Sequence, residues 1–113
     1  MKHKMKLYKE PFFRIKSGKK TIEVRLNDLK RQKISIGDEI EFSLLEGNEK
    51  ILVKVIGLSK FDSFEHLYSS FDYKMFGHPD GTTLSDQLSG VRKYYPEDRE
   101  KEFGVLGIHI RLF

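Results

Sequence analysis

The sequence contains no cysteine among its 113 residues. This absence excludes disulfides, thiol nucleophiles and thiolate metal sites, and it is compatible with a reducing compartment. No stretch of the chain approaches the roughly 18 consecutive apolar residues that a membrane-spanning helix needs. The first six residues alternate lysine with His and Met and lack the apolar segment of a secretion signal. We therefore expect a cytoplasmic protein that does not contact membranes.

Sequence motifs of several common activities are also missing. The chain has no serine-hydrolase motif, no phosphate-binding loop and no dinucleotide-binding glycine pattern. Its four histidines show no metal-ligand spacing, and no cysteine is present to complete a zinc site. We therefore expect neither a metal ion nor another cofactor.

Positive charge is concentrated in the first third of the chain. The net charge is +4, but residues 1–33 hold 12 Lys or Arg against 3 Asp or Glu, whereas residues 34–113 hold 9 against 14. Lysine and arginine bind polyanions by displacing counterions from phosphates, so this distribution favours an anionic partner, most commonly a nucleic acid. A solvated basic surface is the alternative, and charge alone does not separate the two.

Alternating apolar and polar residues predict five short strands and several short helices. We expect one domain over residues 1–113, because no repeat or low-complexity tract divides the chain and 38% of its residues are hydrophobic. Asp62 and Glu65 have capping-box spacing, and Gly57 marks a bulge or bend. The expected strands are residues 3–8, 21–26, 39–44, 51–58 and 105–112, and the expected helices follow residues 9, 62, 83 and 96. Short strands with scattered helices favour an α+β domain with a mainly antiparallel sheet or small barrel.

The strand over residues 21–26 carries charged side chains on one face. Ile22 and Leu26 belong to its apolar face, and Glu23 and Arg25 to the other, about 7 Å apart by strand geometry. Lys20, just before the strand, is a flexible cation that can bind an anion or, with a lowered pKa, act as a base or nucleophile. The alternative is an ordinary exposed ion pair, which contributes under about 1 kcal/mol.

The longest segment without a regular pattern covers residues 71–83. Long loops in compact domains are often functional, so Tyr73 and Phe76 are candidates for stacking on bases, and His78 and Asp80 for proton transfer or for lining a pocket. A turn formed by the neighbouring glycines and proline explains Asp80 equally well.

The pattern Gly18-x-Lys20-x-x-Glu23-x-Arg25 resembles the signature of the ASCH domain, a relative of the PUA-like RNA-binding barrels. Further similarity lies in the segments 36–42, 94–96 and 104–108, so the resemblance covers nearly the whole chain. It implies a small PUA-like β-barrel of about five strands with flanking short helices. It also implies a cleft that receives Lys20, Glu23 and Arg25 and binds RNA or a modified nucleoside.

The resemblance also implies an alternative activity. Some similar bacterial proteins are amidohydrolases that deacetylate N4-acetylcytidine with a lysine, a threonine and a glutamate. Lys20 matches that lysine, Glu23 stands where the threonine nucleophile is expected, and Asp80 falls near the glutamate position. Thr21 is displaced from the nucleophile position. A general-base mechanism, in which Glu23 activates water and the two cations stabilise an oxyanion, is chemically possible.

Our leading hypothesis from the sequence is a domain that binds RNA or a nucleotide-like ligand, with residues 73–80 as a lid. An amidohydrolase of acylated nucleosides and a protein-binding module without chemistry are the alternatives. Lys20, Glu23 and Asp80 are the catalytic candidates. The further ligand-binding candidates are Lys19, Thr21, Arg25, Tyr73 and His78.

Overall fold

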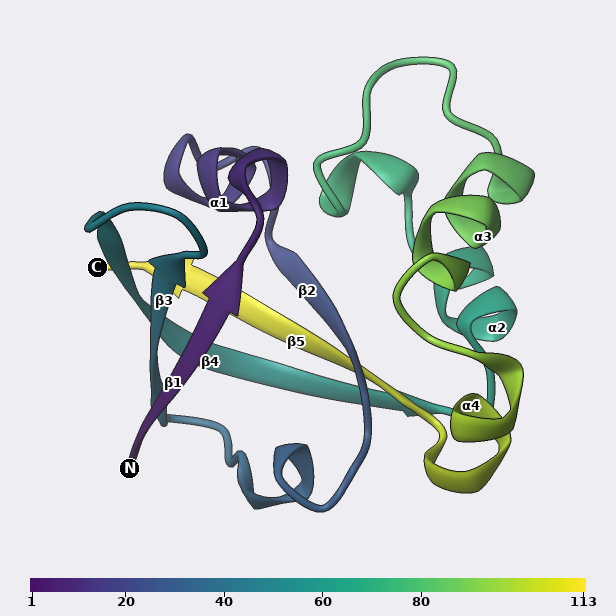
Figure 1. Cartoon of the computed structure of the whole chain (residues 1–113), viewed down its shortest axis with the longest axis horizontal. Helices are drawn as coiled ribbons and strands as arrows, with labels where there is room; N and C mark the ends of the chain where they lie inside the picture. Colours follow the sequence, from purple (N-terminus) through teal and green to yellow (C-terminus); the bar gives the residue numbers. More distant parts are fainter.

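Five strands form one curled sheet, which four short helices flank (Figure 1). The computed structural model describes all residues from 1 to 113. The strands are β1 (Lys2–Leu7), β2 (Ile22–Leu26), β3 (Glu39–Leu44), β4 (Lys50–Phe61) and β5 (Val105–Leu112). The helices are α1 (Lys9–Lys16), α2 (Phe64–Ser69), α3 (Leu84–Arg92) and α4 (Glu97–Phe103), with single 3₁₀ turns η1 (Arg31–Lys33) and η2 (Tyr73–Met75). The α+β class predicted from the sequence is confirmed.

The strands follow the order β1-β3-β4-β5-β2 across the sheet. Only the β1–β3 pair is parallel, and the other three pairs are antiparallel. The register of β4 against β5 shifts between Val55 and Gly57, which confirms the predicted irregularity at Gly57. The sheet curls into a half-barrel, and the guanidinium of Arg25 on edge strand β2 donates to the carbonyl of Lys6 on edge strand β1, with Nη2 3.1 Å from the oxygen.

Two hydrophobic clusters occupy the two sides of this sheet. The larger one packs α1, through Phe12 and Ile15, against strands β1, β3, β4 and β5. The smaller one packs α2 and α3, through Phe64, Leu67 and Val91, against β2 and the start of β5. Strand residues alternate between faces, so a half-barrel can supply both clusters from the same strands. Strand β5 contributes to both clusters, with Val105 in the smaller one and Leu106, Ile108 and Ile110 in the larger one.

Local sequence signals placed most helix ends within a residue or two. Thr83 caps α3 in a capping box with Asp86, and Gly104 ends α4 with a positive φ. The capping prediction for Asp62 was wrong, because Ser63 is the N-cap of α2 and accepts a hydrogen bond from the backbone N–H of His66. The extended backbone of Ser63 directs its short hydroxyl at that N–H, which satisfies a free donor of the first turn.

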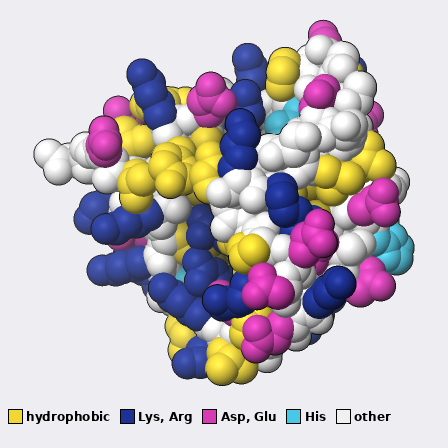
Figure 2. All heavy atoms as spheres, turned by 45° about the vertical axis from the view of Figure 1, so that its right-hand side comes forward, with side chains coloured by type: hydrophobic (Ala, Val, Ile, Leu, Met, Phe, Trp, Pro, Cys, Tyr) yellow, Lys and Arg dark blue, Asp and Glu magenta, His cyan; other side chains and the backbone are white.

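The surface charge is uneven, as the sequence indicated. Figure 2 shows Lys and Arg side chains gathered mainly on one side of the visible face, with Asp and Glu side chains more frequent on the other. The three lysines of β1, Lys2, Lys4 and Lys6, are all exposed, whereas Met5 and Leu7 between and beyond them are buried. Alternation along the strand thus places these lysines in one row on its outer face. No helix is long and apolar enough to cross a membrane.

Candidate functional site

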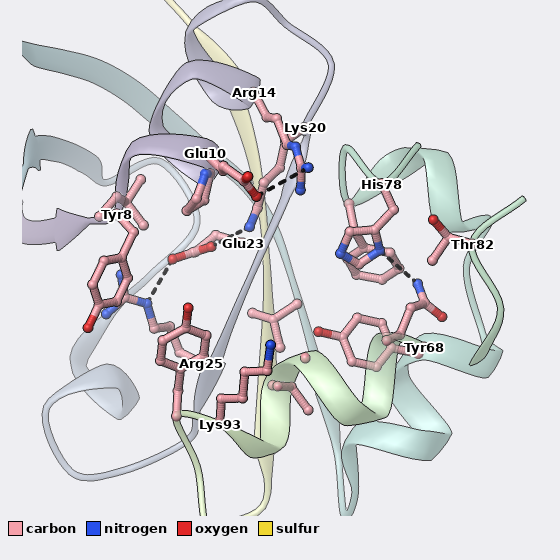
Figure 3. A pocket seen from close by; sticks show the side chains of 18 of the residues that line it. Tyr8, Glu10, Arg14, Lys20, Glu23, Arg25, Tyr68, His78, Thr82 and Lys93 are labelled. Atoms are coloured by element: carbon pink, nitrogen blue, oxygen red, sulfur yellow. Dashed lines mark hydrogen bonds and ion pairs between the residues drawn. The ribbon is translucent and has the colours of Figure 1, made fainter. Parts of the chain in front are cut away.

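A pocket of about 480 Å³ lies where the two halves of the molecule meet. Its lining comes from the end of β1 and from α1, β2, α2 and α3, and from the segment that joins η2 to α3 (Figure 3). The segment at residues 76–82 forms one wall, and the β2 side chains form the floor. The polar and aromatic side chains of the lining include Lys6, Tyr8, Arg14, Lys20, Glu23, Arg25, Tyr68, His78, Gln87, Lys93 and Tyr94.

The charged face of β2 is turned into this pocket and not toward open solvent. Glu23 is only 4% exposed, although glutamate is rarely buried. Lys20 Nζ lies 2.9 Å from Glu23 Oε1, and Arg25 Nε lies 2.8 Å from Glu23 Oε2. The carboxylate therefore binds one cation with each oxygen, and the three side chains form one cluster (Figure 3).

The cluster carries one net positive charge. Burial opposes the charge of Glu23, but Lys20 and Arg25 outweigh that effect and lower the pKa of Glu23 to about 2. Burial likewise opposes the charge of Arg25, while Glu23 outweighs it and raises the pKa of the guanidinium. Arg25 Nη1 and the remaining protons of Lys20 Nζ are not used within the cluster. The floor thus offers several N–H donors, and both oxygens of its one carboxylate are already paired with cations.

The wall opposite β2 carries neutral polar groups. His78 Nδ1 lies 3.1 Å from Nε2 of Gln87, a residue of α3 that is 6% exposed. The hydroxyl of Tyr68, from α2, points toward the pocket (Figure 3). Burial is the main cause that lowers the pKa of His78 to about 4, and the nearby charges of Lys20 and Arg14 contribute to the same shift. This imidazole is therefore uncharged at neutral pH.

The mouth of the pocket is bordered by aromatic rings and a further cation. Tyr8 precedes α1 and Tyr94 follows α3, and their ring centroids lie 5.3 Å apart. Both rings are more than half exposed, at 53% and 57%. The side chain of Lys93 points toward the pocket and lies between Arg25 and Tyr68 in the view of Figure 3. Rings and cations at a polar pocket suit a ligand that has both a planar and an anionic part.

The family model for the ASCH domain matches residues 5–113. The chain belongs to the ASCH domain family. Hypothetical protein PH0355, known from a crystal structure, is 36% identical in sequence to this chain. The two structures superpose with a TM-score of 0.89 over 100% of both chains. The solution structure of protein PF0455 from Pyrococcus furiosus is 32% identical, with a TM-score of 0.79 over 100% of this chain and 98% of that one.

More distant ASCH structures share the fold. The ZmASCH S128A mutant protein from Zymomonas mobilis is 16% identical, with a TM-score of 0.68 over 97% of this chain and 67% of that one. The ASCH domain from Lactobacillus crispatus JV V101 is 13% identical, with a TM-score of 0.65 over 98% and 79% of the two chains. No curated protein matched the chain. The predicted family and its PUA-like half-barrel are thereby confirmed.

The ASCH motif residues and His78 meet in the pocket, whereas other predicted residues lie elsewhere. Lys19 and Asp80 are exposed and are not part of the lining. The Tyr73 hydroxyl accepts from the backbone N–H of Gly81 and does not line the pocket. Thr21 lines a separate cavity of about 360 Å³, and its hydroxyl donates to the carbonyl of Met75. The structure thus brings together Lys20, Glu23, Arg25 and His78. Phe76, a predicted stacking residue, also lines the pocket but is only 1% exposed, because it packs in the core.

Several lining residues of this ASCH domain carried no signal in the sequence. Gln87 and Tyr68 lie at helical positions that are typical of core packing. Arg14 is one of several charged residues of α1, and Lys93 is the C-cap of α3. Only the packing of α2 and α3 against β2 shows that these side chains share a pocket with Lys20.

The arrangement is better suited to binding than to general-base catalysis by Glu23. A base must be free to accept a proton near neutral pH, and Glu23 has both oxygens paired and a pKa of about 2. The Thr21 hydroxyl faces the other cavity and is not near the water that Glu23 would activate. No group of three His, Asp or Glu side chains is placed to hold a metal ion.

Proposed function

We propose that this ASCH domain binds a nucleotide, either free or as one unit of an RNA strand, with its phosphate at Lys20 and Arg25. One observation carries the proposal, namely that two nearly buried cations at the floor of an open pocket retain unused N–H donors. Phosphate oxygens are acceptors only, and charge-assisted hydrogen bonds to them are among the strongest in proteins. A donor-rich floor whose one carboxylate is already paired with both cations matches that ligand group.

Glu23 has a positioning role in this proposal. Two buried cations without a counterion would repel each other and lose their hydration, at a cost of several kcal/mol each. The carboxylate between them offsets this cost and fixes Lys20 Nζ and Arg25 Nε at 2.9 and 2.8 Å from its two oxygens. The donors are therefore oriented before the ligand arrives, which reduces the entropy that binding must overcome.

The size and charge of the pocket support a ligand of nucleotide size. A volume of about 480 Å³ lies within the range of small-molecule sites. Five Lys or Arg side chains line the pocket against three Asp or Glu. The exposed rings of Tyr8 and Tyr94 at the mouth provide faces on which a base or a neighbouring base can stack.

An RNA strand has a basic path from this pocket along β1. Lys6 lines the pocket, and Lys4 and Lys2 continue the row on the outer face of the strand, about 7 Å apart by strand geometry. Lys2 is also paired with Glu41 of β3, with Nζ 3.3 Å from the carboxylate. Exposed lysines in a row bind a phosphate backbone without reading its sequence. The pocket would hold one nucleotide of the strand and the row its neighbouring phosphates.

The proposal is tested by titrating labelled single-stranded RNA and nucleoside monophosphates into the protein, with fluorescence anisotropy or calorimetry as the readout. Lys20→Met removes the cation but keeps most of the apolar stem, and we expect a loss of about 10- to 100-fold in affinity. Lys19→Met is the matched control, since it removes the same charge from an exposed neighbour outside the pocket.

The dependence on salt separates RNA binding from binding of a single nucleotide. If the RNA makes about four phosphate contacts, a plot of log affinity against log salt concentration should have a slope of about −3. Equal affinity of wild type and Lys20→Met, or the absence of any binding, would count against the proposed function. An equal loss in both lysine variants would assign the effect to net charge and not to the pocket.

A further inference from the structure

We propose that the wall formed by His78 and Tyr68 is a base-recognition site for a heterocycle with a carbonyl group next to a ring N–H. Uracil and guanine have such an edge, whereas adenine and cytosine do not. The inference rests on the proposed function and extends it, because it names the base that accompanies the phosphate bound at Lys20 and Arg25.

The hydroxyl of Tyr68 is an unpartnered polar group at the edge of the core. Tyr68 is 7% exposed, and its ring packs edge-on against Phe76 with centroids 4.8 Å apart. No protein group hydrogen-bonds its hydroxyl, which points into the pocket (Figure 3). The ring is buried but the hydroxyl opens onto the pocket, and it can both donate and accept a hydrogen bond there. The pocket is therefore where its partner binds.

Gln87 determines which nitrogen of His78 carries the proton. The amide Nε2 of Gln87 can only donate, so His78 Nδ1, 3.1 Å away, is the acceptor. The ring proton of the neutral imidazole must then be on Nε2, which has no partner in the protein. Gln87 is a positioning residue here, because it is 6% exposed and its amide nitrogen is engaged with His78 Nδ1.

The backbone around His78 is held firmly against β2. Phe76 forms an isolated bridge with Lys20, and its ring stacks on that of His78 with centroids 6.0 Å apart. Gly77, with φ of 77°, brings the chain so close to Lys20 that a Cβ there would lie 2.9 Å from the lysine Cβ. The imidazole is thus placed by packing on one side and by Gln87 on the other, as a selective site requires.

Both groups of this wall are neutral near pH 7, unlike the floor. Burial raises the pKa of the Tyr68 hydroxyl, and burial with nearby cations lowers that of His78 to about 4. Their ring centroids lie 6.2 Å apart, so they can contact neighbouring atoms of one heterocycle. His78 Nε2–H donates to the carbonyl oxygen, and the oxygen of Tyr68 accepts from the adjacent ring N–H.

The test compares UMP, GMP, AMP and CMP with ribose 5-phosphate and phosphate-free uridine, by calorimetry and by NMR of the histidine ring nitrogens. Wild type should bind UMP and GMP about tenfold more tightly than AMP or CMP, the equivalent of one hydrogen bond. Tyr68→Phe should remove most of this preference and leave ribose 5-phosphate unchanged. Tyr73→Phe is the matched control, because it removes a tyrosine hydroxyl that does not line the pocket.

Gln87→Leu should change the tautomer signature of the His78 nitrogens and reduce the UMP preference, without altering ribose 5-phosphate affinity. AMP binding as tightly as UMP, or an unchanged ratio in Tyr68→Phe, would overturn the inference. If uridine shifts the His78 signals but UMP and ribose 5-phosphate bind no better than uridine, the phosphate site fails and the base site stands. If neither uridine nor UMP shifts these signals, the base site is overturned. The phosphate site is overturned as well only if ribose 5-phosphate also fails to bind.

Discussion

Gly77 packs directly against Lys20, at a distance that leaves no room for a side chain. A Cβ at position 77 would lie 2.9 Å from the Cβ of Lys20 and 3.1 Å from Cδ of Arg14. The glycine also has a φ of 77°, which other residues seldom adopt. This contact joins the wall that carries His78 to the floor that carries Lys20, and so it defines the shape of the pocket.

Gly77→Ala should therefore destabilise the protein and also move the wall. We expect a loss of about 2 kcal/mol in the free energy of unfolding, from backbone strain together with the steric overlap. Urea denaturation measures it. Gly81→Ala is the control, since Gly81 has a similar φ of 83° but open space around it, and only about 1 kcal/mol of strain should appear there. Equal losses in the two variants would contradict the close contact.

Glu23→Gln should unfold more easily than wild type at neutral pH. The substitution keeps the shape of the side chain but leaves Lys20 and Arg25 without their buried counterion, which we expect to cost about 3 kcal/mol. Glu46→Gln, at an exposed turn position, is the control and should change little. A neutral effect of Glu23→Gln on urea denaturation would show that the cluster contributes no stability.

The lowered pKa of Glu23 predicts how the free energy of unfolding changes with pH. The folded-state pKa of Glu23 is about 2, against an ordinary value of 4.5. Because the unfolded state takes up this proton first, the contribution of Glu23 is complete above about pH 4.5 and is lost as the pH falls toward 2. Between about pH 4.5 and pH 2, the free energy of unfolding should fall less steeply in Glu23→Gln than in wild type, as urea denaturation at each pH would measure. Parallel curves would contradict the lowered pKa.

Incubation with N4-acetylcytidine should release no acetate above background. The reason is that Glu23 is paired and acidic, Thr21 faces another cavity, and Asp80 lies outside the pocket. Chromatographic detection of cytidine provides the measurement. Turnover by wild type that Lys20→Ala abolishes would show an amidohydrolase instead, with a different base from Glu23.

The pattern of residues alone was sufficient for the ASCH resemblance, for all five strands and for the charged face of β2. These features depend on residues that are close in the sequence. The period of two marks the strands, Thr83 caps the start of α3, and Gly104 marks the end of α4. Errors arose where adjacent residues compete for the same local role. Asp62 and Ser63 are both good caps, and only the backbone at Ser63 determined which one binds the helix.

The sequence by itself determined that Lys20, Glu23 and Arg25 lie together, because their spacing on and just before one strand brings them within reach of each other. Tertiary structure alone decided that this face is buried, since α2, α3 and residues 76–82 pack against β2 through contacts between distant residues. It also decided that His78, Gln87 and Tyr68 face the cluster while Asp80 and Tyr73 do not. Such contacts depend on how side chains fill the core, and no local periodicity records them.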